Sequence, residues 1–395
     1  MLTGKTIVLG VTGSIAAYKI ANLASMLVKL NADVHVIMTQ NATHFITPMT
    51  FETLTNNKCI VDTFDRNFNF DVKHVSLAKK GDLFLVAPCT ANVIGKVAGG
   101  ICDDMLTTTI MATKAPVLFS PAMNTGMWEN PILQANLQKL KQYGYHIIEP
   151  VEGRLACGDI GSGKMPSEEM LLEQILLRLA KEKDLKGKKI LVTAGPTQEG
   201  IDPVRFITNH SSGKMGYAIA KMAVLRGAEV TLVSGPVNIQ PFAGIQVVPV
   251  VSAQDMFQAV TSRSATYDII IMCAAVADYT PANYVDQKVK KQDGDLSIAL
   301  KRTSDILAWL GEHKPKYQFL VGFSMETENL IENSREKLVK KHVDIICANS
   351  IAEEKTGFAT DSNKVTIISQ VGVNELPLCS KEETADMILD HIISL

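Results

Sequence analysis

The sequence predicts two α/β domains in tandem, each built on a doubly wound parallel sheet. Short apolar segments rich in β-branched residues end in glycine and threonine, and each leads towards a stretch with apolar residues at helical spacing. This pattern occurs twice along 395 residues, and the length suits two or three domains of about 150 residues each. Apolar strands that alternate with helices are typical of parallel sheets covered on both faces, as in Rossmann-like and flavodoxin-like folds.

The two halves begin alike and continue alike. Residues 4–13 open the first half and residues 187–195 open the second. Apolar residues then recur at helical spacing, at Ile20, Leu23, Leu27 and Leu30 and again at Ala218, Ile219, Met222 and Leu225. Further strands are expected in corresponding places, at 33–38 and 82–87 in the first half and at 229–233 and 268–274 in the second. The correspondence indicates two copies of one type of architecture.

Composition and charge exclude several classes of protein. Hydrophobic residues make up 46% and charged residues 20% of the chain, which excludes wholesale disorder. The net charge of -2 argues against a nucleic-acid partner. The longest apolar run, residues 269–277, is far shorter than the ~20 residues of a membrane helix. Seven scattered cysteines without a Cys-x-x-Cys pair support neither a disulfide framework nor a zinc site, and without a targeting signal we expect a cytoplasmic protein.

The boundary between the halves is expected in the charged stretch 181–187. This stretch follows an expected amphipathic helix at 170–179 and ends in Gly187. Charged segments of this kind are usually solvated linkers. The predicted domains are therefore residues 1–184 and 185–395, joined by a plain solvated linker.

Candidate site residues of the first half follow the expected strands, because ligands of open α/β sheets bind beyond the carboxyl ends of the strands. Gly13 and Ser14 follow the first strand, where free N–H groups and a hydroxyl would suit a phosphate. A small, polar segment at 87–92 follows the third apolar strand, and the cluster 121–128 follows the next. A glycine turn or an asparagine turn in such a place can also be purely structural.

Two further residues stand out in the first half. His74 lies just before a strand, where a lone histidine is more often structural than catalytic. Cys157 lies in the glycine-rich segment 153–163. Most cysteines are buried and inert, but a thiol among small residues in a loop can deliver a proton to a site and exclude water.

Taken in order, these segments resemble flavin-dependent cysteine decarboxylases, and specifically the phosphopantothenoylcysteine decarboxylases. The resemblance rests on five marks, namely GSIAAYK at 13–19, His74, the AP-x-TAN segment at 87–92, PAMN at 121–124 and ACGD at 156–159. It implies a bound FMN, which provides the electron sink that loss of CO2 from a cysteine carboxylate requires.

The same resemblance implies a role for each marked residue. His74 is expected to act in oxidation and decarboxylation, Asn124 to hold the substrate carboxylate, and Cys157 to deliver the final proton. Contacts with FMN are expected at Gly13, Ser14, Thr39, Thr90 and Asn92. Cys89 departs from the family, which more often has alanine or serine there, and it would place a thiol near the flavin.

The second half carries a different set of signals. Gly213 and Gly216 stand at the head of an expected helix, but a complete G-x-G-x-x-G and a ribose-binding acid are missing, which disfavours a nicotinamide dehydrogenase. Lys288, Lys290 and Lys291 form a run that is usually a solvated surface, although such a run could also neutralise a triphosphate and its leaving pyrophosphate. Similarly, the lysines at 337, 340 and 341 fit an exposed helix face, and Phe323 could stack on a base or simply pack.

From Gly187 to the C-terminus the chain resembles phosphopantothenate–cysteine ligases. The marks are NHSSGKMG at 209–216, AAVAD at 274–278 and K-x-KK at 288–291. The resemblance implies that CTP activates 4'-phosphopantothenate as an acyl-cytidylate, which cysteine then attacks, and that Mg2+ accompanies the triphosphate on ligands the sequence does not identify.

In this ligase-like half the resemblance places Asn209 at the acyl-cytidylate and Lys288 on a loop that closes over it. Residues 304–307 stand where the family usually has a Pro-Asp-Ile loop, and Ser304 in place of the proline bears on the rigidity of this second loop. Contacts with CTP are expected at Ala274, Asp278, Lys288, Ser304, Asp305, Ile306, Leu307, Phe323, Lys337 and Lys341.

Together the halves predict a bifunctional enzyme that makes 4'-phosphopantetheine from 4'-phosphopantothenate, cysteine and CTP. A non-catalytic flavin-binding regulator is the main alternative, but it would not need both His74 and Cys157 beside an intact Asn124. A decarboxylase of peptide C-terminal cysteines is a second alternative, disfavoured by the ligase-like half. The resemblance also implies a homo-oligomer with trimeric contacts in the first half and dimeric contacts in the second.

Overall fold

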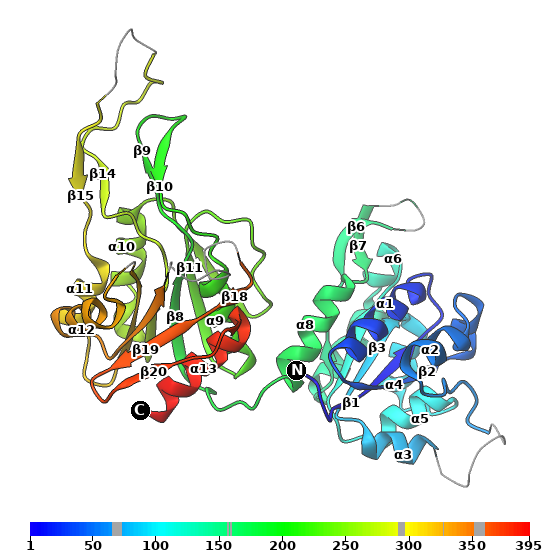
Figure 1. The fold of residues 1–395 in the computed structure, drawn as a ribbon. Coiled ribbons are helices and arrows are strands. Elements are labelled where there is room, and N and C mark those ends of the chain that lie inside the picture. Colours follow the sequence, from blue (N-terminus) through cyan, green and yellow to red (C-terminus); the bar gives the residue numbers. More distant parts are fainter. Residues whose placement is uncertain (65–72, 156–157, 159, 291–296, 327, 351–359) are drawn as a thin grey trace. The chain divides into compact units, whose positions relative to one another are not determined.

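The computed structural model describes the chain except residues 65–72, 156–157, 159, 291–296, 327 and 351–359. It divides into two compact units, Met1–Lys181 and Glu182–Leu395, each with its own sheet (Figure 1). The boundary falls three residues before the predicted one, at the start of the charged stretch.

The first unit is built on a five-stranded parallel sheet of order β2-β1-β3-β4-β5. Every residue of β1, β3 and β4 is buried, as expected for strands covered on both faces. The strands are β1 (Thr6–Val11), β2 (Asp33–Met38), β3 (Leu83–Cys89), β4 (Val117–Pro121) and β5 (His146–Ile147).

Helices cover both faces of this sheet in two groups. The helices α1 and α8 pack together, and α2 packs on α1, whereas α3, α4, α5 and α7 pack among themselves. An antiparallel hairpin of β6 (Val151–Arg154) and β7 (Ile160–Lys164) precedes the last helix. The helices are α1 (Ala17–Lys29), η1 (Gln40–His44), α2 (Pro48–Thr55), α3 (Lys73–Lys80), α4 (Ala91–Gly99), α5 (Met105–Ala112), α6 (Thr125–Trp128), α7 (Pro131–Gln142) and α8 (Glu168–Leu179). The doubly wound α/β prediction is confirmed for this unit.

The second unit is built on an eight-stranded sheet of order β12-β11-β8-β13-β16-β17-β19-β20. The strands from β12 to β17 are parallel, but β19 and β20 are antiparallel additions at one edge that the sequence did not predict. The strands are β8 (Lys189–Ala194), β11 (Glu229–Ser234), β12 (Ile245–Pro249), β13 (Ile269–Met272), β16 (Phe319–Glu326), β17 (Ile345–Ser350), β19 (Val365–Ser369) and β20 (Val373–Glu375).

Five α-helices of the described second unit flank this sheet, with α9 packed on α13 and α10 packed on α11. Three short antiparallel pairs, β9–β10, β14–β15 and β18–β21, leave the sheet at its loops (Figure 1). The helices are α9 (Lys214–Leu225), α10 (Ala253–Thr261), η2 (Ser264–Thr266), α11 (Ile306–His313), α12 (Leu330–Lys340) and α13 (Lys381–Ser394). The short strands are β9 (Gln198–Gly200), β10 (Phe206–Thr208), β14 (Tyr279–Pro281), β15 (Leu300–Arg302), β18 (Ser362–Asn363) and β21 (Cys379–Ser380).

The stretch predicted to be a plain solvated linker is instead fastened to the second unit, so that expectation is wrong. Leu185 is 2% exposed, and its N–H donates to the Arg226 carbonyl over 3.0 Å. The Arg226 guanidinium, 5% exposed, donates to Asp184 and also to Asp386 and Asp390 on α13. Because the guanidinium needs several carboxylates to offset its burial, it draws the charged segment onto the fold.

Among the helices that the structure describes, none has the length and apolar character needed to cross a membrane.

Candidate active sites

The first unit has a cavity of about 510 Å³ near the carboxyl edge of its sheet. It brings together Ser14, from the turn after β1, and Asn124, from the turn after β4. Lys19 on α1 and two cations of the β6–β7 hairpin, Arg154 and Lys164, complete its polar lining. The cavity therefore joins one predicted flavin contact to the predicted carboxylate-binding residue.

Asn124 is held in this cavity by the helix that it starts. It is the N-cap of α6, and its Oδ1 accepts a hydrogen bond from the Met127 N–H over 2.8 Å. The preceding turn is fixed where the Ala122 N–H donates to the Cys89 carbonyl over 3.0 Å. Because the cap occupies the amide oxygen, the side-chain NH2 is the group that can donate to an anionic ligand.

The β6–β7 hairpin lies directly on the loop that carries Asn124. The Met123 N–H donates to the Gly163 carbonyl, and the Thr125 hydroxyl donates to the Ser162 carbonyl, both over 3.0 Å. A Cβ on Gly163 would lie 2.4 Å from the Met123 carbonyl oxygen, and Gly163 has a φ of +123°. Glycine is therefore required there for the hairpin to dock.

The other predicted flavin contacts lie outside the lining of this cavity but at the same edge of the sheet. Thr39 and Thr90 directly follow β2 and β3, and Asn92 is exposed in the first turn of α4. The ends of β1 and β3 are tied together because the Thr12 hydroxyl donates to Pro88 and accepts from the Thr90 N–H.

The hydroxyl of Thr39 indicates a ligand site. Its Oγ1 is buried and has no hydrogen-bond partner. Buried hydroxyls are normally satisfied, so an orphaned one at a binding edge suggests a partner that the chain itself does not supply. Gly13 lies close by, since a Cβ on it would be 2.7 Å from the Cβ of Asn41 in the segment after Thr39.

The remaining residues singled out in the first unit are not among the described residues that line this cavity. His74 is half-buried in the first turn of α3 and does not line the cavity. Cys157 lies outside the described residues. Cys89 is buried at the end of β3, and burial raises the pKa of its thiol well above the ordinary value, so the thiol stays protonated.

The second unit has a cavity of about 450 Å³ that gathers eight of the ten predicted CTP contacts. We call it the Asp305 cavity. It lies at the carboxyl edge of the sheet, where the segments after β13 and β15 meet Phe323 of β16 and Lys341 at the end of α12. The eight residues are Ala274, Asp278, Ser304, Asp305, Ile306, Leu307, Phe323 and Lys341.

A charged pair closes one side of the Asp305 cavity. Asp305 is the N-cap of α11, where its Oδ1 accepts from the Ala308 N–H over 3.0 Å, and Lys341 Nζ lies 3.0 Å from its Oδ2. Burial acts to raise the pKa of Asp305, but these two partners outweigh it and hold the pKa below its usual value. Asp305 therefore remains ionised and can accept hydrogen bonds from a ligand at neutral pH.

A second cavity of this unit, of about 390 Å³, adjoins the Asp305 cavity, and Ala274 and Phe323 line both. We call it the Asn209 cavity. Its floor is the loop 211–216 that opens α9, where Gly213 has a φ of +76° and a Cβ on Gly216 would lie 2.6 Å from the Ala194 Cβ. Asn209 stands at its edge, with its amide directed at the carbonyls of Ala275 and Val276.

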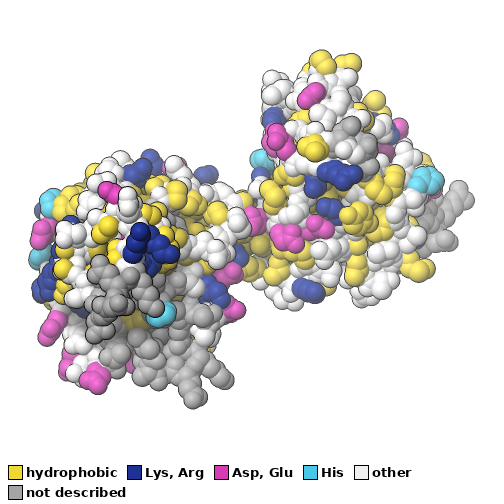
Figure 2. All heavy atoms as spheres, turned by 90° about the horizontal axis from the view of Figure 1, so that it is seen from above, with side chains coloured by type: hydrophobic (Ala, Val, Ile, Leu, Met, Phe, Trp, Pro, Cys, Tyr) yellow, Lys and Arg dark blue, Asp and Glu magenta, His cyan; other side chains and the backbone are white. Residues whose placement is uncertain are grey.

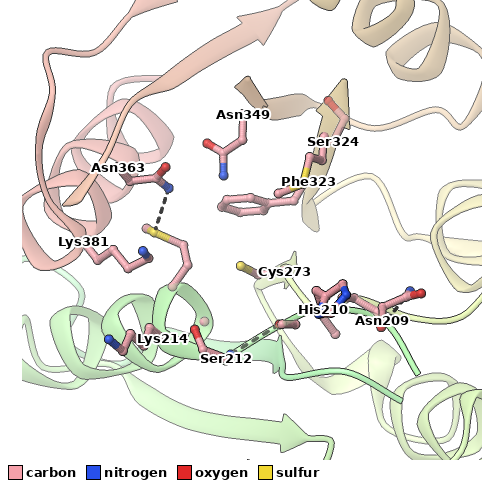
Figure 3. A pocket seen from close by; sticks show the side chains of 17 residues that line it. Asn209, His210, Ser212, Lys214, Cys273, Phe323, Ser324, Asn349, Asn363 and Lys381 are labelled. Atoms are coloured by element: carbon pink, nitrogen blue, oxygen red, sulfur yellow. Dashed lines mark hydrogen bonds between the residues drawn. The ribbon is translucent and has the colours of Figure 1, made fainter. Parts of the chain in front are cut away.

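Several residues of the Asn209 cavity were missed by sequence reasoning. Figure 3 shows the Phe323 ring, the Cys273 sulfur and the Lys381 ammonium facing a common space. Asn349 also lines it, with a buried Oδ1 that lacks a hydrogen-bond partner. The ammonium of Lys381, 8% exposed, donates to the carbonyls of residues 360 and 362. Only the pairing of distant strands brings this lysine, 172 positions after Asn209, into the cavity.

Two residues predicted to contact CTP lie outside both cavities. Lys337 is half-buried one turn before Lys341 on α12. Lys288 is exposed, and its neighbour Val289 is fastened to the β9–β10 connection, with its N–H on Asp202 and its carbonyl on Arg205. The prediction that Lys288 closes over the acyl-cytidylate remains a proposal.

Comparisons with known proteins agree with this division of the chain. Residues 1–180 match the family model described as Flavoprotein, and residues 185–395 match the model described as DNA/pantothenate metabolism flavoprotein C-terminal domain. The coenzyme A biosynthesis bifunctional protein CoaBC of Bacillus subtilis (strain 168) is 47% identical over 399 residues, covering 100% of this chain and 98% of the relative. The protein of the same name from Escherichia coli (strain K12) is 41% identical over 396 residues, with the same coverage.

Among solved structures, the C-terminal domain of a coenzyme A biosynthesis bifunctional protein CoaBC is 48% identical, with a TM-score of 0.46, covering 53% of this chain and 95% of that one. The full-length matches to curated relatives confirm the resemblance found in the sequence and favour a bifunctional enzyme over a flavin-binding regulator. The chain therefore belongs to the family of coenzyme A biosynthesis bifunctional proteins.

Proposed function

We propose that the first unit decarboxylates 4'-phosphopantothenoylcysteine with FMN, and that the second unit makes this substrate from 4'-phosphopantothenate, cysteine and CTP. The observation that carries the proposal is the Asp305 cavity, because one cavity gathers eight residues expected to contact CTP from segments far apart in the sequence. A chain of this family with a nucleotide cavity in one unit and a flavin-compatible edge in the other is suited to both reactions.

The carboxyl edge of the first sheet fits FMN. The unpartnered hydroxyl of Thr39 and the hydroxyls of Ser14 and Thr90 are suited to a phosphate or a ribityl chain. Gly13 lets the segment after Thr39 approach closely, since a Cβ there would lie 2.7 Å from the Asn41 Cβ. FMN would supply the redox chemistry that makes the substrate carbanion accessible. Asn92 completes the proposed contacts from the first turn of α4.

Three side chains of the protein would take part in the decarboxylation. The Asn124 NH2 would donate to the substrate carboxylate and orient it for departure of CO2. His74 would act as the base in the oxidative half, and Cys157 would return the final proton. Docking of the β6–β7 hairpin on residues 123–125 supports a covered site, which keeps water from the reacting carbon.

In the ligase unit we assign the nucleoside of CTP to the Asp305 cavity and the reacting phosphates to the adjoining Asn209 cavity. The Asp305 cavity offers carboxylates and backbone groups that suit a base and a ribose, with the Phe323 ring as a stacking surface. The loop 211–216 offers backbone N–H groups at the head of the 12-residue helix α9, which favours anions. Asn209, at the edge of this loop, would hold the activated acyl group.

Mg2+ is proposed to enter with the triphosphate. In the described part of the chain, no three His, Cys, Asp or Glu side chains come close enough together to hold a metal ion. Mg2+ commonly keeps several waters and binds through substrate phosphates rather than through a protein cage. A homo-oligomer with trimeric contacts in the first unit and dimeric contacts in the second, and a cytoplasmic location, also stay predictions.

The proposal is tested by supplying each reaction separately to the purified protein. CO2 release is measured with 4'-phosphopantothenoylcysteine, and pyrophosphate and CMP are measured with CTP, 4'-phosphopantothenate and cysteine. We expect both activities and the absorption bands of an oxidised flavin. A colourless protein that cannot be reconstituted with FMN would refute the first assignment, and nucleotide-independent ligation would refute the second.

A further inference from the structure

The cavity of the first unit has a positive charge that the proposed chemistry does not use. Lys19, Arg154 and Lys164 line it, and no aspartate or glutamate stands among its described lining residues. Figure 2, which views the molecule from above Figure 1, shows Lys and Arg side chains gathered on this face of the first unit. Three like charges around one hollow repel one another, so the arrangement favours an anionic ligand.

The fold brings these cations together from two separate elements. Lys19 lies in the first turn of α1, whereas Arg154 ends β6 and Lys164 ends β7. The Lys164 side chain reaches across the hairpin to Gly153, the residue before Arg154. A Cβ built on Gly153 would lie 3.4 Å from the Lys164 Nζ, so the ammonium is close to the β6 strand that carries Arg154. The hairpin itself is docked on the loop of Asn124, so the cations and Asn124 form parts of one site.

These side chains are available to a ligand. In the part of the chain that the structure describes, neither Arg154 nor Lys164 forms a salt bridge. The carboxylate that interacts with Lys19 is Glu169 at the start of α8, whose pKa is lowered mainly by backbone and Ser167 hydrogen bonds and only weakly by Lys19. The charge of the cavity is therefore not neutralised from within.

We propose that Lys19, Arg154 and Lys164 bind the terminal phosphate of the decarboxylation substrate and so select phosphorylated over unphosphorylated substrate. The inference rests on the proposed function, because Asn124 is assigned to the carboxylate at the other end of that molecule. A phosphate monoester carries a charge of about −1.5 to −2 at neutral pH. A guanidinium and two ammonium groups match that charge with charge-assisted hydrogen bonds.

FMN also ends in a phosphate monoester, and the structure favours the substrate as the source. Of the hydroxyls proposed for the flavin, Ser14 lines this cavity, whereas Thr39 and Thr90 lie outside its lining. Arg154 and Lys164 instead belong to the hairpin that covers residues 123–125, on the side of Asn124. The cationic lining is therefore assigned to the substrate.

The test compares two substrates in three variants of the full-length flavoprotein. CO2 release is measured for Lys19→Gln, Arg154→Gln and Lys164→Gln with 4'-phosphopantothenoylcysteine and with pantothenoylcysteine. A charge-assisted hydrogen bond to a phosphate is worth about tenfold to a hundredfold in affinity. We expect kcat/KM to fall by that factor for the phosphorylated substrate, mainly through KM, and to stay unchanged for the unphosphorylated one.

Two controls separate this role from others. Lys139→Gln removes an equivalent charge from the exposed face of α7 and should change the activity with neither substrate. Flavin absorbance per protein should be the same in all variants. Equal losses on both substrates, unchanged activity with both, or loss of bound FMN would each overturn the proposal, the last because it would assign the cations to the flavin phosphate. Wild-type protein inactive on both substrates would instead refute the proposed function itself.

Discussion

At the scale of single residues, two buried polar atoms without hydrogen-bond partners indicate where ligands bind. The Thr39 hydroxyl in the first unit and the Asn349 amide oxygen in the second are buried without partners, and each lies at the carboxyl edge of its sheet. A buried polar group without a partner costs about 1–3 kcal/mol. Such a cost is offset when a bound ligand supplies the missing hydrogen bond.

Thr39→Val should therefore weaken FMN binding with little effect on folding. Valine keeps the shape and removes the hydroxyl, and the lost hydrogen bond corresponds to about a fivefold to tenfold increase in Kd. The measurement is the flavin absorbance retained on dialysis, with Thr43→Val as a control, because the Thr43 hydroxyl is exposed and bonds its own helix at Gln40. Wild-type retention of FMN by the Thr39 variant would remove this residue from the flavin site.

At the scale of elements, the segment before β8 acts as part of the second unit. Arg226, at the end of α9, holds Asp184 of this segment and two aspartates of α13, so one guanidinium joins three pieces of chain. Asp184 has a pKa below its usual value mainly because of its hydrogen bond from Arg226. This contact fastens the segment before β8 to the second unit.

Arg226→Met should destabilise the second unit by about 3 kcal/mol, because it leaves three carboxylates close together without their cation. Urea unfolding of the ligase unit measures the loss, and Arg263→Met is the matched control, since Arg263 is an exposed arginine of the same unit. Equal stability of the two variants would show that the cluster is dispensable.

The same contact predicts a pH dependence. A carboxylate with a lowered pKa in the folded state stabilises the fold above its ordinary pKa of about 4, and this contribution is lost as the pH falls through the lowered value. Asp184→Asn should therefore reduce the melting temperature at pH 7, and its difference from the wild type should shrink below about pH 4. A difference that grows on acidification would contradict this role of Asp184.

The sequence predicted the elements that carry the sites better than it predicted their surroundings. The strand at 33–38 was predicted with its observed bounds, because its valine and isoleucine residues are typical of a strand. The antiparallel strands β19 and β20 and the fastened segment at Asp184 were missed, because both depend on contacts between residues far apart in the sequence. For the same reason local motifs indicated Asp305 and Phe323 but not Lys381.

At the scale of the whole molecule, each unit has its own sheet, core and cavities. Residues 1–181 alone should fold, bind FMN and release CO2, and residues 182–395 alone should release pyrophosphate. A ligase fragment that starts at Gly187 should be less stable than one that starts at Glu182, because it lacks Asp184 and Leu185. Circular dichroism melts of the two ligase fragments measure the difference, and identical melting curves would contradict the account of this segment.

The central claim is that two independent sites on one chain carry two consecutive reactions, and mixing two variants tests it most directly. Asn124→Ala should convert 4'-phosphopantothenate, cysteine and CTP only as far as 4'-phosphopantothenoylcysteine. Lys341→Gln should be slow in that step, but it should decarboxylate 4'-phosphopantothenoylcysteine at the wild-type rate. The measurement is the formation of 4'-phosphopantetheine by each variant alone and by an equimolar mixture. The account predicts little product from either variant and restored synthesis by the mixture, whereas loss of both reactions in either variant, with its fold intact, would contradict it.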